Sequence, residues 1–112
     1  MSGQDLTFNV NGKPVGGYLA LPSQSDAPGV IVLHAWWGLN DTIKGFCDRL
    51  ASAGFVAFAP DLYHGQVATT IPEAEALGKA LDAQAEQAKA EVAEAAAYLL
   101  QFAGQPRGGA WR

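Results

Sequence analysis

Hydrophobic and polar positions follow their most informative pattern near the middle of the chain. Val30–Leu33 and Phe55–Ala59 are continuous apolar runs, too short for helices and typical of strands that are buried on both faces. Between them, residues 41–53 carry apolar side chains on one helical stripe, with Asn40 and Asp41 as alternative N-caps and Gly54 as the expected C′ residue. Strand, helix and strand at this spacing predict a right-handed βαβ crossover with two parallel strands.

A β-hairpin is predicted ahead of this unit. Asp5–Val10 alternates between apolar and polar residues, Asn11-Gly12 is the strongest short-range hairpin signal, and Val15–Leu21 can form the returning strand. The opening of the chain is therefore expected to be an antiparallel hairpin that feeds the first buried strand.

From Pro72 to about Phe102 the sequence is alanine-rich, and its apolar residues recur at helical spacing. Gly78 is a candidate point of division into two helices. The opposite side is expected to be a solvated face, with the charged residues Glu86, Lys89, Glu91 and Glu94. Residues 104–112 show no strand pattern, and we expect a loose tail at the end of a single domain spanning 1–112.

Composition narrows the class of protein. A hydrophobic fraction of 49% with 16% charged residues is typical of a folded domain rather than a disordered chain. The net charge of −4 argues against electrostatic binding to nucleic acid or to an anionic membrane. The single cysteine, Cys47, favours a reducing compartment. We see no signal peptide and no apolar run long enough to span a bilayer, so we expect a cytoplasmic protein.

Two loops carry the residue types that bind small molecules. The loop after the first buried strand contains His34, Trp36 and Trp37, and the loop after the second contains Tyr63 and His64. Both leave the carboxyl ends of parallel strands, where ligands of open α/β sheets bind. We therefore expect the two loops to converge on a substrate pocket.

Structural roles compete with this interpretation. Two adjacent tryptophans cannot both point inward, so pocket lining and packing over the sheet stay equally open for them. For His34, a hydrogen bond to the loop backbone is favoured over a role as a base. Tyr63 is expected to anchor its loop, and Asp61 to act as a turn or cap residue.

Two other kinds of site are not expected. The two histidines with Asp41 and Asp61 match no recognised metal-ligand spacing, so we predict no metal. Cys47 lies on the apolar stripe of a predicted helix, where burial would raise the pKa of its thiol and leave it inert as a nucleophile.

The segments VIVLHAWWGLND (residues 30–41) and FVAFAPDLYHG (residues 55–65) are similar to the dienelactone hydrolase family, a branch of the α/β-hydrolase fold. The resemblance covers roughly residues 5–102. It implies the amino-terminal part of that α/β fold, with an antiparallel opening, parallel strands and a long carboxyl-terminal helical segment. Family members hydrolyse lactones and related carboxylic esters without a cofactor, so no cofactor is expected.

The family's nucleophile is a cysteine or serine in the pattern Gly-x-Cys/Ser-x-Gly, followed by an aspartate and then a histidine. No such pattern occurs here, so the resemblance implies an amino-terminal half without a nucleophile, acid or catalytic histidine. It places an oxyanion-hole backbone N–H on Trp36. Ala35, which joins the candidate pocket, stands where the best-known members carry a glutamate that contacts the nucleophile.

We therefore expect part of a hydrolase of small carboxylic esters or lactones that is inactive alone. The alternative is a non-enzymatic half-domain that forms a homodimer or complements a partner through an exposed edge beside Val30–Leu33. A third possibility is a shortened form of a longer enzyme, which the nucleotide sequence beyond Arg112 would decide.

Overall fold

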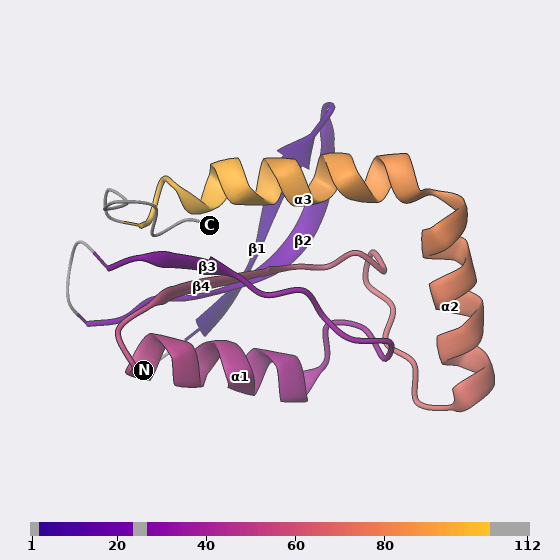
Figure 1. Cartoon of the computed structure of the whole chain (residues 1–112), viewed down its shortest axis with the longest axis horizontal. Helices are drawn as coiled ribbons and strands as arrows, with labels where there is room; N and C mark the ends of the chain where they lie inside the picture. The colour runs from indigo at the N-terminus through magenta and orange to yellow at the C-terminus, as the bar shows by residue number, and fades with distance from the viewer. Residues whose placement is uncertain (1–2, 24–26, 104–112) are drawn as a thin grey trace.

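The structure, a computed structural model, describes residues 3–23 and 27–103, and the predicted tail, residues 104–112, lies outside the described residues. The strands are β1 (Gly3–Val10), β2 (Lys13–Ala20), β3 (Gly29–Ile31) and β4 (Val56–Pro60), and the helices are α1 (Asp41–Ser52), α2 (Ile71–Ala83) and α3 (Ala85–Leu99). The strands form one sheet in the order β1-β2-β4-β3. As Figure 1 shows, α1 covers one face of this sheet, α3 covers the other, and α2 lies across its end.

The predicted hairpin is confirmed. β1 and β2 pair antiparallel, and Val10 lies opposite Lys13 at the turn. Asn11 and Gly12 between them have φ angles of 53° and 82°. Both central residues of a type I′ turn need this left-handed conformation, which Asn and Gly adopt at the lowest cost.

The predicted βαβ unit is confirmed as well. β3 and β4 pair in parallel on either side of α1 in the chain. β3 ends at Ile31, two residues before the predicted end at Leu33, although the N–H of Val32 still donates to the carbonyl oxygen of Phe58 at 2.9 Å. The chain therefore leaves the sheet just before His34.

β4 is buried on both faces, as its continuous apolar sequence predicts. Val56 and Phe58 pack in the core cluster beneath α3, and Ala57 and Ala59 pack in the cluster above α1. The ring of Phe58 lies 5.4 Å from that of Tyr98 in α3. The two-residue period of the strand thus divides the core into a layer with bulky side chains and a layer in which β4 presents only alanine.

α1 begins and ends where the sequence predicts. The side chain of Asn40 accepts a hydrogen bond from the N–H of Ile43 at 3.1 Å, which caps the first turn. Gly54 has φ of 100°, and its N–H and that of Phe55 donate to carbonyl oxygens of the last turn. This is the Schellman arrangement, with glycine at C′.

The helical segment after Pro72 divides at Gln84, so the prediction of a division at Gly78 was wrong. Gln84 has φ of −119° and ψ of 40°, and the chain turns there from the end of the sheet onto its face. Gly78 lies inside α2, where a Cβ atom would come within 3.2 Å of Nε1 of Trp36. Close packing, rather than helix breaking, accounts for glycine at this position.

No helix in the described ranges is both long and apolar enough to cross a membrane.

Candidate functional site

His34 joins the two loops that leave the carboxyl ends of β3 and β4. Its Nε2 accepts a hydrogen bond from the N–H of Leu62 at 3.1 Å, and its Nδ1 lies 2.9 Å from the carbonyl oxygen of Ala35. A backbone N–H donates only to an unprotonated nitrogen and a carbonyl only accepts, so these partners assign the ring proton to Nδ1. The predicted hydrogen bonding of His34 to the loop backbone is confirmed, and both of its nitrogens are occupied.

The peptide between Ala35 and Trp36 is held in one orientation. The Ala35 oxygen accepts from the His34 ring and from the N–H of Gly38 at 3.0 Å. Because a trans peptide is planar, the Trp36 N–H points the opposite way from that oxygen. Among the described residues no acceptor is assigned to this N–H. The loop thus presents a positioned backbone donor.

Tyr63 anchors this peptide from the second loop. Its side chain is buried, its hydroxyl donates to the carbonyl oxygen of Trp36 at 3.0 Å, and its ring centroid lies 4.7 Å from that of His34. Burial raises the pKa of Tyr63, and the nearby Asp82 carboxylate raises it further. Tyr63 therefore stays a neutral hydroxyl donor at physiological pH.

Asp61 shapes the loop that carries Tyr63. One carboxylate oxygen accepts from the N–H of Tyr63 at 3.1 Å and the other from the N–H of Gly65 at 2.7 Å. The predicted roles of Asp61 as a turn residue and of Tyr63 as a loop anchor are both confirmed.

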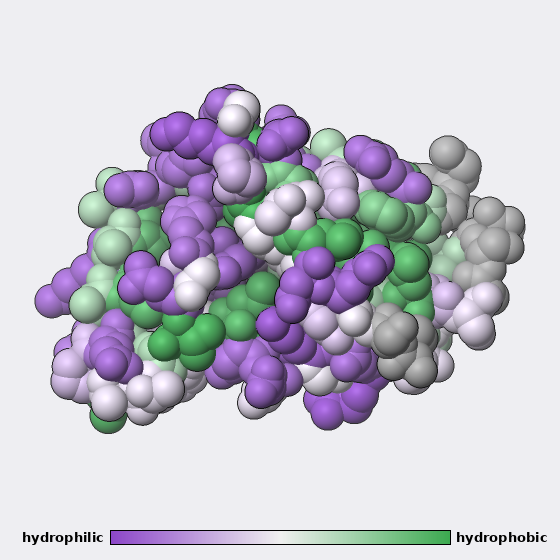
Figure 2. All heavy atoms as spheres, turned by 180° about the vertical axis from the view of Figure 1, so that it is seen from behind, coloured by the Kyte–Doolittle hydropathy of each residue, from purple (hydrophilic) through white to green (hydrophobic). Residues whose placement is uncertain are grey.

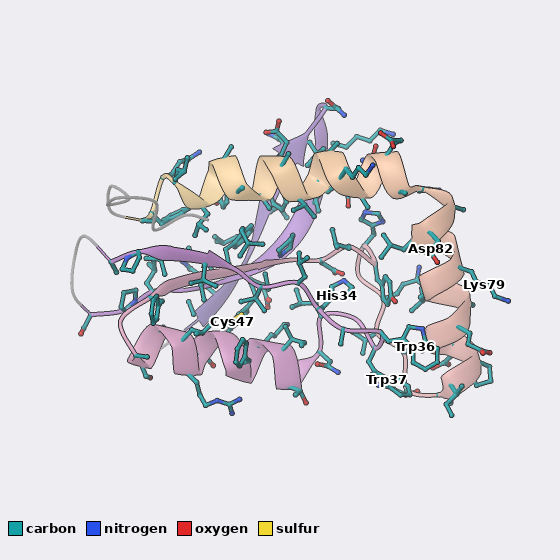
Figure 3. The ribbon with its side chains drawn as sticks, in the orientation of Figure 1. His34, Trp36, Trp37, Cys47, Lys79 and Asp82 are labelled. Carbon is teal, nitrogen blue, oxygen red and sulfur yellow. The ribbon has the colours of Figure 1, made fainter. Side chains whose placement is uncertain are left out.

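A cleft of about 440 Å³ opens between these loops and α2. Its lining residues are His34, Ala35, Trp36, Leu62, Tyr63, Glu75, Gly78, Lys79, Leu81 and Asp82. Trp36 is 43% exposed and points toward α2, whereas Trp37, whose ring lies edge-on at 5.6 Å from that of Trp36, is not in the lining (Figure 3). The structure thus brings together His34, Ala35, Trp36 and Tyr63 of the candidate residues.

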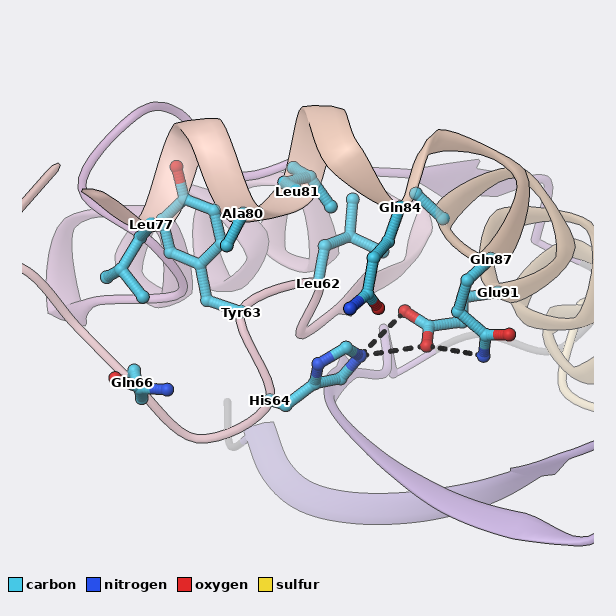
Figure 4. Close-up of a pocket in the computed structure, with 11 residues that line it drawn as sticks. Leu62, Tyr63, His64, Gln66, Leu77, Ala80, Leu81, Gln84, Gln87 and Glu91 are labelled. Carbon is cyan, nitrogen blue, oxygen red and sulfur yellow. Dashed lines mark hydrogen bonds and ion pairs between the residues drawn. The ribbon is translucent and has the colours of Figure 1, made fainter. Parts of the chain in front are cut away.

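His64 faces a second, smaller cavity of about 110 Å³. Its Nε2 lies 2.9 and 2.8 Å from the two carboxylate oxygens of Glu91 in α3, and the side-chain amide of Gln87 donates to the same carboxylate at 3.0 Å (Figure 4). Glu91 is only 2% exposed, so its predicted place on a solvated helix face was wrong. The loop of β4 covers this part of α3 and supplies the partner that a buried carboxylate needs.

Sequence reasoning missed the wall that α2 contributes to the cleft. Glu75, Lys79 and Asp82 are three or four residues apart, which places them on one side of a helix. That spacing was visible in the sequence, but nothing in it indicated which loop the helix would face.

Cys47 is unsuited to act as the nucleophile. It lies in α1 with no exposed surface, and burial, with a smaller contribution from Asp48, raises the pKa of its thiol to about 11. The nucleophile is a thiolate, so this cysteine is inert at neutral pH. Across residues 3–23 and 27–103, no group of three or more His, Cys, Asp or Glu side chains could hold a metal ion.

The strand order, the βαβ unit and the helices on both faces define the amino-terminal part of an α/β-hydrolase fold. The model of the "Dienelactone hydrolase family" matches residues 15–107, and the chain belongs to that family.

Individual relatives agree with this assignment. The chain is 54% identical over 69 residues to "Protein usf" of Aquifex pyrophilus, covering 59% of this chain and 29% of that protein. It is 52% identical over 69 residues, with the same coverage, to a protein of Aquifex aeolicus (strain VF5) provisionally named carboxymethylenebutenolidase. A crystal structure provisionally named dienelactone hydrolase, from Klebsiella pneumoniae subsp. pneumoniae, is 28% identical with a TM-score of 0.76, covering 93% of this chain and 45% of that one. The chain thus spans less than half the length of each.

Proposed function

We propose that this chain supplies the oxyanion-hole loop and one wall of the substrate pocket of a hydrolase of carboxylic esters or lactones. The observation that carries the proposal is the fixed orientation of the Ala35–Trp36 peptide. Its N–H has no assigned acceptor among the described residues, and both Ala35 and Trp36 line the cleft. Family membership supports hydrolytic chemistry of this kind.

In ester hydrolysis, negative charge develops on the carbonyl oxygen when the nucleophile attacks. A backbone N–H that is already oriented stabilises this charge without reorganising during the reaction. Here His34 and Gly38 hold the oxygen on one side of the peptide, and Tyr63 holds the next carbonyl. The Trp36 N–H is thereby preorganised to donate to an oxyanion.

We further propose that the chain alone does not turn over esters. The sequence contains no Gly-x-Cys/Ser-x-Gly elbow, and its one thiol is buried in α1. The direct test is hydrolysis of an activated aryl ester and of a small unsaturated lactone by purified protein, beside the Cys47→Ala variant. Turnover that disappears in Cys47→Ala would contradict the proposed inactivity of the chain alone and would make the Cys47 thiol the nucleophile.

The oxyanion role is tested by adding the carboxyl-terminal remainder of a family member, which supplies the elbow. We expect the pair to hydrolyse the ester, and Trp36→Pro, which deletes the N–H, to lower kcat by about 10²- to 10³-fold. Trp36→Phe is the matched control because it changes the ring and keeps the N–H. Equal loss in both variants would assign the effect to the ring and reject the oxyanion role.

The second candidate function is self-association or complementation through the edge of the sheet. β3 is the last strand in the order, pairs with β4 among the described strands, and is followed by Leu33, which is 55% exposed. An apolar strand edge favours addition of another strand. Sedimentation as a monomer at high concentration would contradict this proposal.

A further inference from the structure

Gly78 is a point of close contact between α2 and the loop that carries Trp36. A Cβ atom at residue 78 would lie 3.2 Å from Nε1 and 3.4 Å from Cδ1 of the Trp36 indole, and 3.8 Å from the hydroxyl oxygen of Tyr63. All three residues line the cleft, and Figure 3 shows the Trp36 ring against α2. The absence of a side chain at Gly78 therefore leaves room for the indole on the wall of the cleft.

Glycine is an unfavourable residue for the helix at this position. Residue 78 lies inside α2, and glycine is the poorest helix former after proline. Gly45 provides the contrast, because it lies inside α1 and a Cβ atom there would meet nothing within 4 Å. A residue that is unfavourable for its own element and lines a cleft is typical of a functional site.

The surroundings of Gly78 decide what would move if a side chain were added there. The backbone of Trp36 is held by the hydrogen bonds to the Ala35 oxygen and by the Tyr63 hydroxyl. Ala74, one turn earlier in α2, has no exposed surface, so moving the helix outward would uncover it. The indole belongs to an exposed residue and can turn about its side-chain bonds. We therefore expect an added side chain to turn the indole and narrow the cleft.

We propose that Gly78 is the specificity-determining residue of this cleft and sets how bulky an ester the cleft admits. It acts through the indole of Trp36, which can lie against α2 because residue 78 has no side chain. The inference rests on the proposed function in placing an ester between Trp36 and α2. It adds a size limit that is set from α2, whereas the oxyanion-hole N–H is positioned by the loop itself.

Two uncharged esters that differ by one fused ring test the proposal by binding, without any need for turnover. They are phenyl acetate and naphthyl acetate, and because neither carries a charge, the charged side chains of α2 act on both alike. Binding is followed by NMR through the backbone N–H groups of Ala35 and Leu62, which line the cleft and are present in every variant. In Gly78→Ala we expect naphthyl acetate to bind at least about fivefold more weakly, because overpacking acts most on the ligand that fills more of the cleft. The binding of phenyl acetate should change by less than about twofold, because the smaller ester leaves the displaced indole more room.

Two further variants isolate the cause. Gly45→Ala makes the same change inside α1, outside the cleft lining, and should leave the binding of both esters unchanged. Trp36→Phe removes the part of the indole that carries Nε1 and Cδ1, the two atoms nearest to residue 78. In that background, Gly78→Ala should change the binding of naphthyl acetate by less than about twofold, because the crowded atoms are gone.

The outcomes separate the size limit from the pocket. Unchanged binding, equal weakening of both esters, or tighter binding of naphthyl acetate in Gly78→Ala overturns Gly78 as the specificity-determining residue and leaves the pocket standing. A selective loss of naphthyl acetate binding that persists in the Trp36→Phe background overturns the role of the indole. Failure of both esters to perturb Ala35 and Leu62 in the wild type overturns the pocket itself and the inference with it.

Discussion

His64 has a backbone conformation that few residues adopt, and its side chain pairs with the buried carboxylate of Glu91. Its φ of 54° lies in the left-handed region. The His64 side chain is 50% exposed, whereas the Glu91 side chain is only 2% exposed. A buried carboxylate without donors is costly, and here Gln87 is the other donor. The pair therefore fastens the loop that carries Tyr63 to α3.

Removing the imidazole should destabilise the protein. We expect His64→Ala to lower the free energy of unfolding by about 1–3 kcal/mol, the cost of leaving a buried acceptor short of a donor. In the Glu91→Gln background, which has no buried charge, the same change should cost clearly less. Denaturant unfolding of the four proteins in this cycle measures both values.

A backbone control accompanies this cycle. Asn tolerates the left-handed region, so His64→Asn changes the side chain with less backbone strain than Ala. If His64→Asn and His64→Ala were as stable as the wild type, the pairing with Glu91 would not be holding the loop.

The roles of residues that bond to near neighbours in the sequence could be predicted, whereas the pairing of Glu91 with a distant residue could not. Asn40, Gly54 and Asp61 act through hydrogen bonds with residues close in sequence, so their types and spacing sufficed to predict their roles. Glu91 finds its partner 27 residues away, at His64. Helical spacing placed it opposite the apolar stripe, but it could not show that a loop covers that position.

Among the elements, α2 shows how packing outweighs intrinsic propensity. Glycine is a poor helix former, yet α2 continues through Gly78 and ends at Ala83. A Cβ at residue 78 would lie 3.2 Å from Nε1 and 3.4 Å from Cδ1 of Trp36. The contact that fixes α2 against the cleft is thus made with Trp36, 42 positions earlier in the chain, which a helical pattern does not encode.

Two glycines in helices provide a matched pair for testing this. Gly45 lies inside α1, and a Cβ there would meet nothing within 4 Å. We expect Gly45→Ala to raise the free energy of unfolding by about 1 kcal/mol, the ordinary gain of alanine over glycine in a helix. Gly78→Ala should gain less or destabilise, because Trp36 must move.

The Trp36→Ala background tests whether the contact with Trp36 causes this difference. Without the indole ring beside residue 78, Gly78→Ala should raise the free energy of unfolding by the ordinary amount. Gly45→Ala should have the same effect as in the wild type. Thermal or denaturant unfolding measures each step. Equal gains for the two glycine substitutions in the wild-type background would show that the contact with Trp36 does not constrain α2.

At the scale of the whole molecule, the sequence predicts the hairpin and the parallel pair, but it does not order them. Alternation and turn residues define each strand, whereas the position of β4 between β2 and β3 depends on which faces α1 and α3 cover.

One consequence of this strand order is that the two edges of the sheet differ. β1 lies on the side seen in Figure 2, where hydrophilic and apolar side chains are interspersed. β3 lies at the other edge, nearest the viewer in Figure 1.

The β3 edge makes the proposed self-association testable by a single charge. The N–H of Val32 still donates to Phe58 of β4, and Leu33, the next residue, is 55% exposed. A lysine at a strand edge opposes the addition of a further strand. If copies of this chain associate through β3, Leu33→Lys should lower the association constant by at least about tenfold in sedimentation equilibrium, a change of 1.4 kcal/mol. Val67→Lys, at a side chain of similar exposure outside the sheet, is the control and should leave association unchanged. Equal dissociation in both variants would reject β3 as the interface, because added charge alone would then account for the effect.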